Sequence, residues 1–316
     1  MINFKQKKRR FSLRKKAMSS AFSRRDYFEL FFSGQVRKKF EKLILVLSIS
    51  GFFIHLLLVM LFNLEVLSGL NVDYFGNPIN AIYTPFSFIL VYEIYLLIFF
   101  IPRSFTTSLL KQYEIIALVL IRRIFGDITK IDFDQALETN EELFNLGIDI
   151  LAVLLLLAIV LLFSRIHLKL NALSRTLLEE ERDFIFKGYK KKLSVVLLLI
   201  IVAVSVAHLV DFVTYSFTND HLIPGMSNNL NSIFYKDFFT LLILADVLVL
   251  LFSYGITQEN FKLLRNTGFI IATILMRISF SATGVLNVTF ILAGSLFGYL
   301  ILLFYYKFVE SQVSIQ

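Results

Sequence analysis

Runs of about 20 predominantly apolar residues recur along most of the chain, and no other feature constrains the fold as strongly. A helix of that length crosses the hydrocarbon core of a bilayer, where only helices and closed barrels satisfy every backbone hydrogen bond. The runs lack the period-2 alternation of barrel strands, so helices are expected. A hydrophobic fraction of 57% and a mean hydropathy of +0.72 exclude a soluble enzyme fold. We therefore predict an all-α, polytopic integral membrane protein.

Eight apolar segments are expected to span the membrane. The third and seventh are the weakest, because each contains an arginine, Arg122 or Arg277, and has only a short uninterrupted apolar stretch. The eight segments cover residues 43–62, 84–101, 108–125, 144–163, 193–217, 234–254, 266–281 and 284–306.

Basic residues concentrate in alternate connecting segments. Residues 1–42 hold 14 Lys and Arg and residues 165–192 hold 8, whereas residues 63–83 and 218–233 hold none. Basic segments remain on the cytoplasmic side of a membrane, so both termini are predicted to be cytoplasmic, and the two weak spans are needed to keep this alternation. A bacterial inner membrane is favoured, because no strong organellar signal is present.

Charge and hydropathy together divide the chain into five parts. The five are a basic cytoplasmic amino-terminal segment (1–42), a first four-helix membrane half (43–167), a charged cytoplasmic connector (168–192), a second four-helix membrane half (193–308) and a short cytoplasmic tail (309–316).

Rare polar residues recur in the same order in the two halves, at an offset of 153 to 155 residues for the first three pairs. The pairs are His55 with His208, Glu93 with Asp246, Arg122 with Arg277, and, near the start of each fourth span, Asp149 with Asn287. We interpret this recurrence as an internal repeat. Because each half has an even number of spans, the halves would be parallel and related by a pseudo-twofold axis along the membrane normal.

The repeated polar residues are expected at similar depths in the outer half of the bilayer. A charged residue at a helix centre costs about 2.5–3.5 kcal/mol on translocon scales, so we expect Glu93 to pair with Arg122 and Asp246 with Arg277. Asp211 follows His208 by three residues and therefore shares its helix face.

Two interpretations of this polar layer remain open. In the first, the layer is an ion pathway, for a proton in particular, through a channel or transporter. In the alternative, the layer is a static lock that fixes the helices of a non-transporting scaffold or subunit. Such a subunit would recruit a soluble or membrane partner through its basic amino terminus. In the first interpretation Arg122 and Arg277 are counter-ions. The predicted pathway residues are Glu93, Asp246, His55, His208, Asp211, Asp149 and Asn287.

Composition and motifs argue against an enzyme or a cofactor protein. The chain has 0 Cys and 4 His, which leaves no thiolate chemistry and little scope for a metal site, so no metal or other cofactor is expected. No Walker loop, nucleophile elbow, zinc-peptidase motif or dinucleotide fingerprint is present. The expected partners are the lipid bilayer, with anionic headgroups at residues 1–42, and further membrane subunits in a homo-oligomer or a larger complex. No nucleic acid is expected as a partner.

Overall fold

The computed structural model describes residues 27–64, 78–128, 141–174, 181–218, 226–257, 259–282 and 284–315. Within these ranges the chain is almost entirely helical and contains no strand. Most of the predicted basic segment, residues 1–26, lies outside the described part, and so does the side chain of Asp211.

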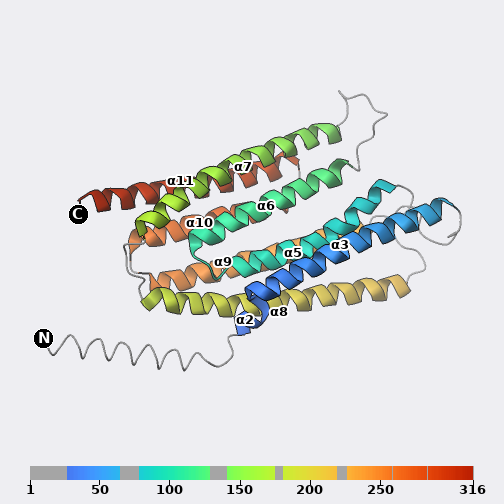
Figure 1. Ribbon diagram of the computed structural model, residues 1–316, viewed down its shortest axis with the longest axis horizontal. Helices are drawn as coiled ribbons and strands as arrows, with labels where there is room; N and C mark the ends of the chain where they lie inside the picture. Colours follow the sequence, from blue (N-terminus) through green and yellow to red (C-terminus); the bar gives the residue numbers. More distant parts are fainter. Residues whose placement is uncertain are drawn as a thin grey trace.

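Each predicted apolar segment lies within one long helix or passes its end by at most two residues, and most of these helices extend several residues beyond the segment. In chain order (Figure 1) the helices are α2 (Tyr27–Phe32), α3 (Gly34–Asn63), the 3-10 helix η1 (Pro78–Ile82), α5 (Tyr83–Phe100), α6 (Phe105–Ile128), α7 (Glu141–Ser174), α8 (Glu181–Thr218), α9 (Met226–Ile256), α10 (Asn260–Ser279) and α11 (Gly284–Ile315).

Among the described residues, five helices are long and apolar enough to cross a membrane by length and composition. Their apolar ranges are Tyr27–Asn63, Leu143–Leu173, Ile185–His208, Asp237–Ile256 and Gly284–Gln312, and Thr84–Phe100 forms a shorter apolar helix. The prediction of a helical membrane protein is confirmed at this level.

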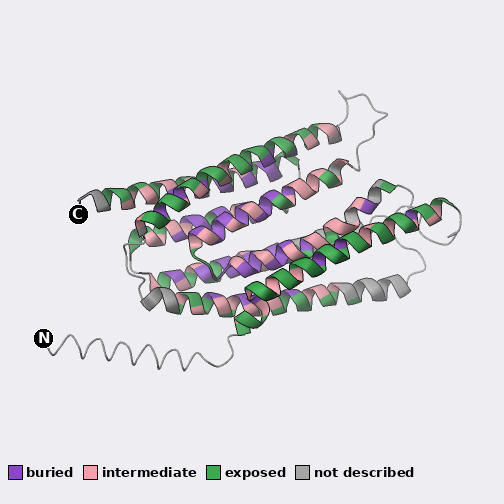
Figure 2. Ribbon diagram, viewed as in Figure 1, coloured by how far each residue is buried: buried purple, intermediate pink, exposed green. Residues whose placement is uncertain are grey.

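The two weakest predicted spans, which form α6 and α10, occupy the middle of the bundle (Figure 2). Helix α6 packs against α5, α7 and α10, and α10 packs against α9 and α11. Large exposed apolar side chains cover α3, α7 and α8, for example Phe53, Leu154 and Val202. Because α6 and α10 contact mostly protein, their polar residues find partners there and require no lipid exposure.

Consecutive helices run in opposite directions and pack in chain order, α3 to α7 in one series and α8 to α11 in another (Figure 1). The two series meet where α5 packs against α8, α6 against α10, and α7 against α11. At one end of the bundle α5 is joined to α6, α9 is joined to α10, and α7 has its last residue. Arg103, Lys191 and Arg265 lie at this end, which we call the basic end.

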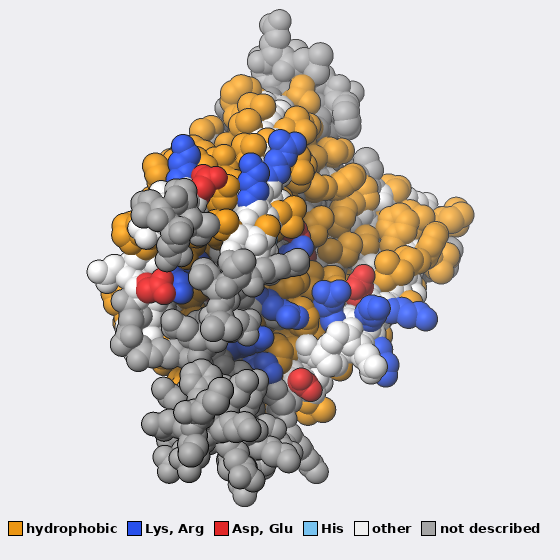
Figure 3. All heavy atoms as spheres, turned by 60° about the vertical axis from the view of Figure 1, so that its left-hand side comes forward, with side chains coloured by type: hydrophobic (Ala, Val, Ile, Leu, Met, Phe, Trp, Pro, Cys, Tyr) orange, Lys and Arg blue, Asp and Glu red, His pale blue; other side chains and the backbone are white. Residues whose placement is uncertain are grey.

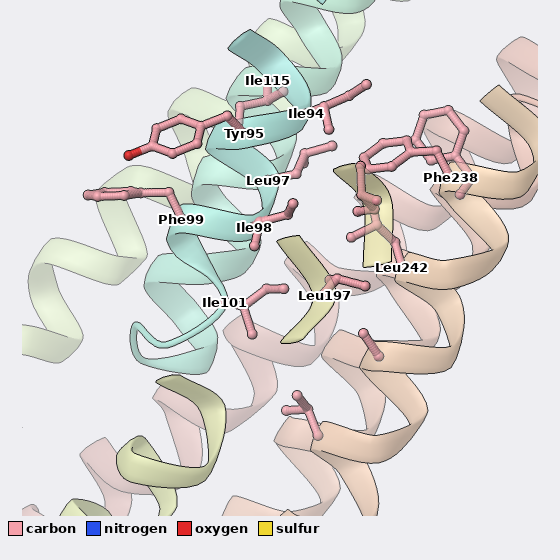
Figure 4. Close-up of a cluster of buried hydrophobic side chains, with 14 of the residues drawn as sticks. Ile94, Tyr95, Leu97, Ile98, Phe99, Ile101, Ile115, Leu197, Phe238 and Leu242 are labelled. Atoms are coloured by element: carbon pink, nitrogen blue, oxygen red, sulfur yellow. The ribbon is translucent and has the colours of Figure 1, made fainter. Parts of the chain in front are cut away.

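Among the described residues, two hydrophobic clusters hold the bundle together. The first joins α5, α8 and α9 through side chains such as Ile98, Leu197 and Leu242 (Figure 4). The second joins α6, α7, α10 and α11 around Tyr113 and Phe163, whose rings make an edge contact with centroids 5.4 Å apart.

Glycines allow α11 to approach its neighbours closely. A Cβ atom at Gly294 would lie 2.9 Å from the Ala272 carbonyl oxygen, and one at Gly298 would overlap the Tyr113 hydroxyl. That hydroxyl donates a hydrogen bond to the Ser295 carbonyl oxygen over 3.0 Å, which links α6 to α11. Small residues four apart permit such backbone contact between membrane helices.

We expect Gly298→Ala to lower the free energy of unfolding by about 1–3 kcal/mol, because the Tyr113 hydroxyl must move and its hydrogen bond is lost. Unfolding in mixed detergent measures the effect. Gly255→Ala is the control, since a Cβ atom there meets nothing within 4 Å. In a Tyr113→Phe background the cost should shrink; an unchanged cost would contradict this explanation.

Candidate functional site

The first buried ion pair links α5 to α6. Arg122 Nη2 lies 3.3 Å from Glu93 Oε2, and Arg122 Nη1 donates to the Phe86 carbonyl oxygen over 3.3 Å. The Glu93 side chain is 3% exposed, and the contact with Arg122 lacks the alignment of a hydrogen bond at Oε2. The pairing predicted from depth is therefore present, as a loose contact.

The second buried ion pair links α9 to α10 and is tighter. Arg277 Nη1 donates to Asp246 Oδ2 in a short contact, and Thr273 Oγ1 donates to the same oxygen over 2.9 Å. The Arg277 and Asp246 side chains are 2% and 10% exposed. This pairing was also predicted, whereas the contribution of Thr273 was not.

A third arginine, Arg123, binds Asp149 and Asn287, two of the predicted pathway residues. Its Nε donates to Asp149 Oδ2 over 2.7 Å, its Nη2 donates to Asp149 Oδ1, and its Nη1 donates to Asn287 Oδ1 over 2.6 Å. Asn287 Nδ2 in turn donates to the Ser279 carbonyl oxygen over 2.6 Å. Arg123 thus clamps α6 to both α7 and α11.

The two histidines occupy corresponding positions between the first and second helices of each series. His55 Nδ1 is hydrogen-bonded to Thr84 Oγ1 over 2.6 Å, and His208 Nε2 lies 3.2 Å from Asp237 Oδ2. Each partner lies 29 residues after its histidine. These contacts with Thr84 and Asp237 were not predicted from the sequence.

Sequence reasoning found both carboxylate–arginine pairs and missed Arg123, Thr273 and Asp237. Adjacent residues on a helix point about 100° apart, so Arg122 and Arg123 face different neighbours, α5 and α7. The double arginine in α6 was the available signal for a second polar contact.

The arrangement can hold ionised carboxylates inside a membrane, because each has a guanidinium partner. The described residues include no group of three or more His, Asp or Glu able to hold a metal ion.

Comparisons of the chain with known protein families, with curated proteins and with solved structures found no match in any of the three.

Proposed function

We propose that this membrane protein moves a small ion, specifically a proton, through its paired carboxylate layer, and that it is not an enzyme. The observation that carries the proposal is the recurrence of one buried carboxylate–arginine pair between the second and third helices of each series, Glu93–Arg122 and Asp246–Arg277. Ionisable residues inside a membrane are costly, and they commonly mark ion or proton pathways.

The proposed topology has eight spans in two parallel four-helix repeats, with both termini on the cytoplasmic side of a bacterial inner membrane. The equal spacing of the two histidine contacts, 29 residues in each series, supports the repeat. The alternation of helix direction gathers the basic connecting segments at one end, which supports the orientation. Oligomerisation or assembly with another membrane subunit remains part of the proposal.

Proton flux into liposomes containing the purified protein tests the proposal directly. Under an imposed potential and pH gradient, we expect Glu93→Gln combined with Asp246→Asn to reduce flux to the level of protein-free liposomes. The physical reason is that the neutral amides keep the shape of the carboxyl groups but can neither bind nor release a proton at neutral pH.

The matched control is Glu114→Gln in α6, because Glu114 pairs with Lys111 at a half-exposed position outside the layer. Its flux should equal that of the wild type. Full flux in the double variant would refute the carboxylate pathway.

The scaffold alternative predicts a different result. A folded wild type without flux, together with a stoichiometric partner lost on deletion of residues 1–40, would favour a subunit that recruits another protein. In that case the ion pairs serve as a lock that fixes helix register.

A specific observation favours anionic lipid headgroups as a partner at the basic end, where Lys and Arg side chains border a hydrophobic surface (Figure 3). The guanidiniums of Arg37 and Arg103 lie 5.4 and 5.6 Å from the centroid of the Phe99 ring. Arg37 Nε is buried without a hydrogen-bond partner, and neither arginine has a carboxylate within 4 Å among the described residues. A phosphate would neutralise a guanidinium that has no carboxylate partner.

We expect anionic vesicles to raise the melting temperature of the protein more than zwitterionic vesicles do, and Arg37→Gln with Arg103→Gln to remove most of that difference. Lys262→Gln is the control, because Lys262 lies at the same end and already pairs with Glu259. Free phosphate at matched concentration distinguishes a lipid from a soluble anion. An undiminished preference in the double variant would rule out this headgroup site.

A further inference from the structure

A small cavity lies between Asp246 and the basic end of the bundle. Its volume is about 30 Å³, and its walls come from α6, α8, α9, α10 and the turn between α5 and α6. Five of the residues that line it are polar and buried: Ser108, Gln112, Lys190, Asp246 and Thr273. A site for one water occupies about 10–15 Å³ on this measure of volume, so the cavity has room for two.

Asp246 offers the cavity a hydrogen-bond acceptor. Both bonds that it accepts, from Thr273 and from Arg277, end at the same carboxylate oxygen, Oδ2. Among the described residues, Oδ1 accepts none. A carboxylate can accept about four hydrogen bonds, so an unused oxygen on a cavity wall is suited to bind water.

Gln112 and Ser108 continue the polar wall along α6 toward the basic end. Gln112 Nε2 donates to Ser108 Oγ over 3.5 Å, one turn away on the same helix face. The remainder of the lining is mostly apolar and includes Val249 and Phe269. Polar groups are therefore aligned along one side of the cavity, as a short row of waters would require.

Lys190 closes the cavity at the basic end. Its ammonium donates to the Arg103 carbonyl oxygen in the turn between α5 and α6, and it lies 4.8 and 4.9 Å from the centroids of the Phe105 and Phe186 rings. The Lys190 residue is 3% exposed. A buried ammonium at this place repels metal cations but can still donate a hydrogen bond to water.

We propose that this cavity holds water that connects Asp246 to the basic end of the bundle, and that Lys190 restricts entry of metal cations to it. The role of this water as one half of a proton route rests on the proposed function. The presence of the water itself does not, because it depends only on the cavity and its polar wall.

The absence of native cysteine allows a direct test, since any introduced thiol is the only one in the chain. Ser108→Cys and Gln112→Cys place a thiol on the cavity wall. Ser194→Cys is the matched control: Ser194 is fully buried on α8, bonds to the Lys190 carbonyl oxygen and does not line the cavity. Ag⁺ is the probe, because it is small enough to replace water.

The full-length protein in sealed vesicles of known orientation is exposed to Ag⁺ from one side at a time. After denaturation, thiols that remain free are alkylated and quantified by mass spectrometry. In the Lys190→Met background we expect the cavity thiols to be blocked from the basic-end side about tenfold faster than the control thiol, which reacts only through local opening. With Lys190 in place, blocking at the cavity thiols should be slower, because the ammonium repels Ag⁺, and the control should be unchanged.

Equal, slow blocking at all three positions in the Lys190→Met background would overturn the proposal, and so would faster blocking from the opposite side. Two cavity positions guard against misfolding of one variant. Because this test measures no flux, its failure is distinct from failure of the transport proposal: a dry cavity with intact carboxylate-dependent flux refutes only the water route.

Discussion

Replacing Arg277 with methionine is expected to lower the free energy of unfolding by about 3–5 kcal/mol, because it leaves the buried Asp246 carboxylate without its charge partner. Asp246 would retain the hydrogen bond from Thr273, which compensates only part of the loss. Reversible unfolding in mixed detergent micelles, followed by circular dichroism, measures the change.

Two comparison variants make this prediction specific to charge burial. Arg277→Met combined with Asp246→Asn removes both charges and should recover most of the stability, since a matched neutral pair has no uncompensated ion. Arg122→Met should cost less than Arg277→Met, because Arg122 is more exposed and its contact with Glu93 is longer. A double variant as unstable as Arg277→Met would contradict the charge argument.

Replacing Arg123 with glutamine is expected to cost about 2–3 kcal/mol, because the side chain of Asp149 is only 9% exposed and would lose the two charge-assisted bonds it accepts. The link between α7 and α11 through Arg123 would be lost as well. Unfolding measurements give the stability, and spin labels on the two helices give the change in their separation.

Arg123→Lys is the informative control for the clamp. A lysine keeps the charge but cannot reach Asp149 and Asn287 with the fixed fork of a guanidinium, so we expect less than half of the lost stability to return. Full recovery with lysine would show that charge alone matters at this position.

The positions of the helices could be predicted from the sequence because a run of about 20 apolar residues marks a helix long enough to cross a bilayer. Hydropathy was weakest for residues 108–125 and 266–281, which became α6 and α10. The reason is physical: these helices contact other helices on most sides, so their residues are matched to protein surroundings. A hydropathy window registers transfer into lipid and therefore underestimates helices in the centre of a bundle.

The carboxylate–arginine pairs could be predicted because depth in the membrane follows from counting residues along a helix. Counting gives no rotation about the helix axis, and for this reason the sequence did not predict that Arg123, next to Arg122, would bind Asp149 and Asn287. The histidines illustrate the same limit. His55 and His208 were predicted as pathway residues, and their contacts with Thr84 and Asp237 could not be predicted from depth alone. Their part in an ion pathway stays a prediction.

The central location of α6 and α10 has a consequence for how the chain enters a membrane during synthesis. As α10 leaves the translocon, its transfer into lipid alone releases little free energy, because it contains Lys262, Arg265, Asn266 and Arg277. Helix α11 follows after a connection of only four residues, 280–283, and packs along α10. We therefore expect α10 to partition into the bilayer as a hairpin with α11, so that truncation before Gly284 leaves α10 uninserted.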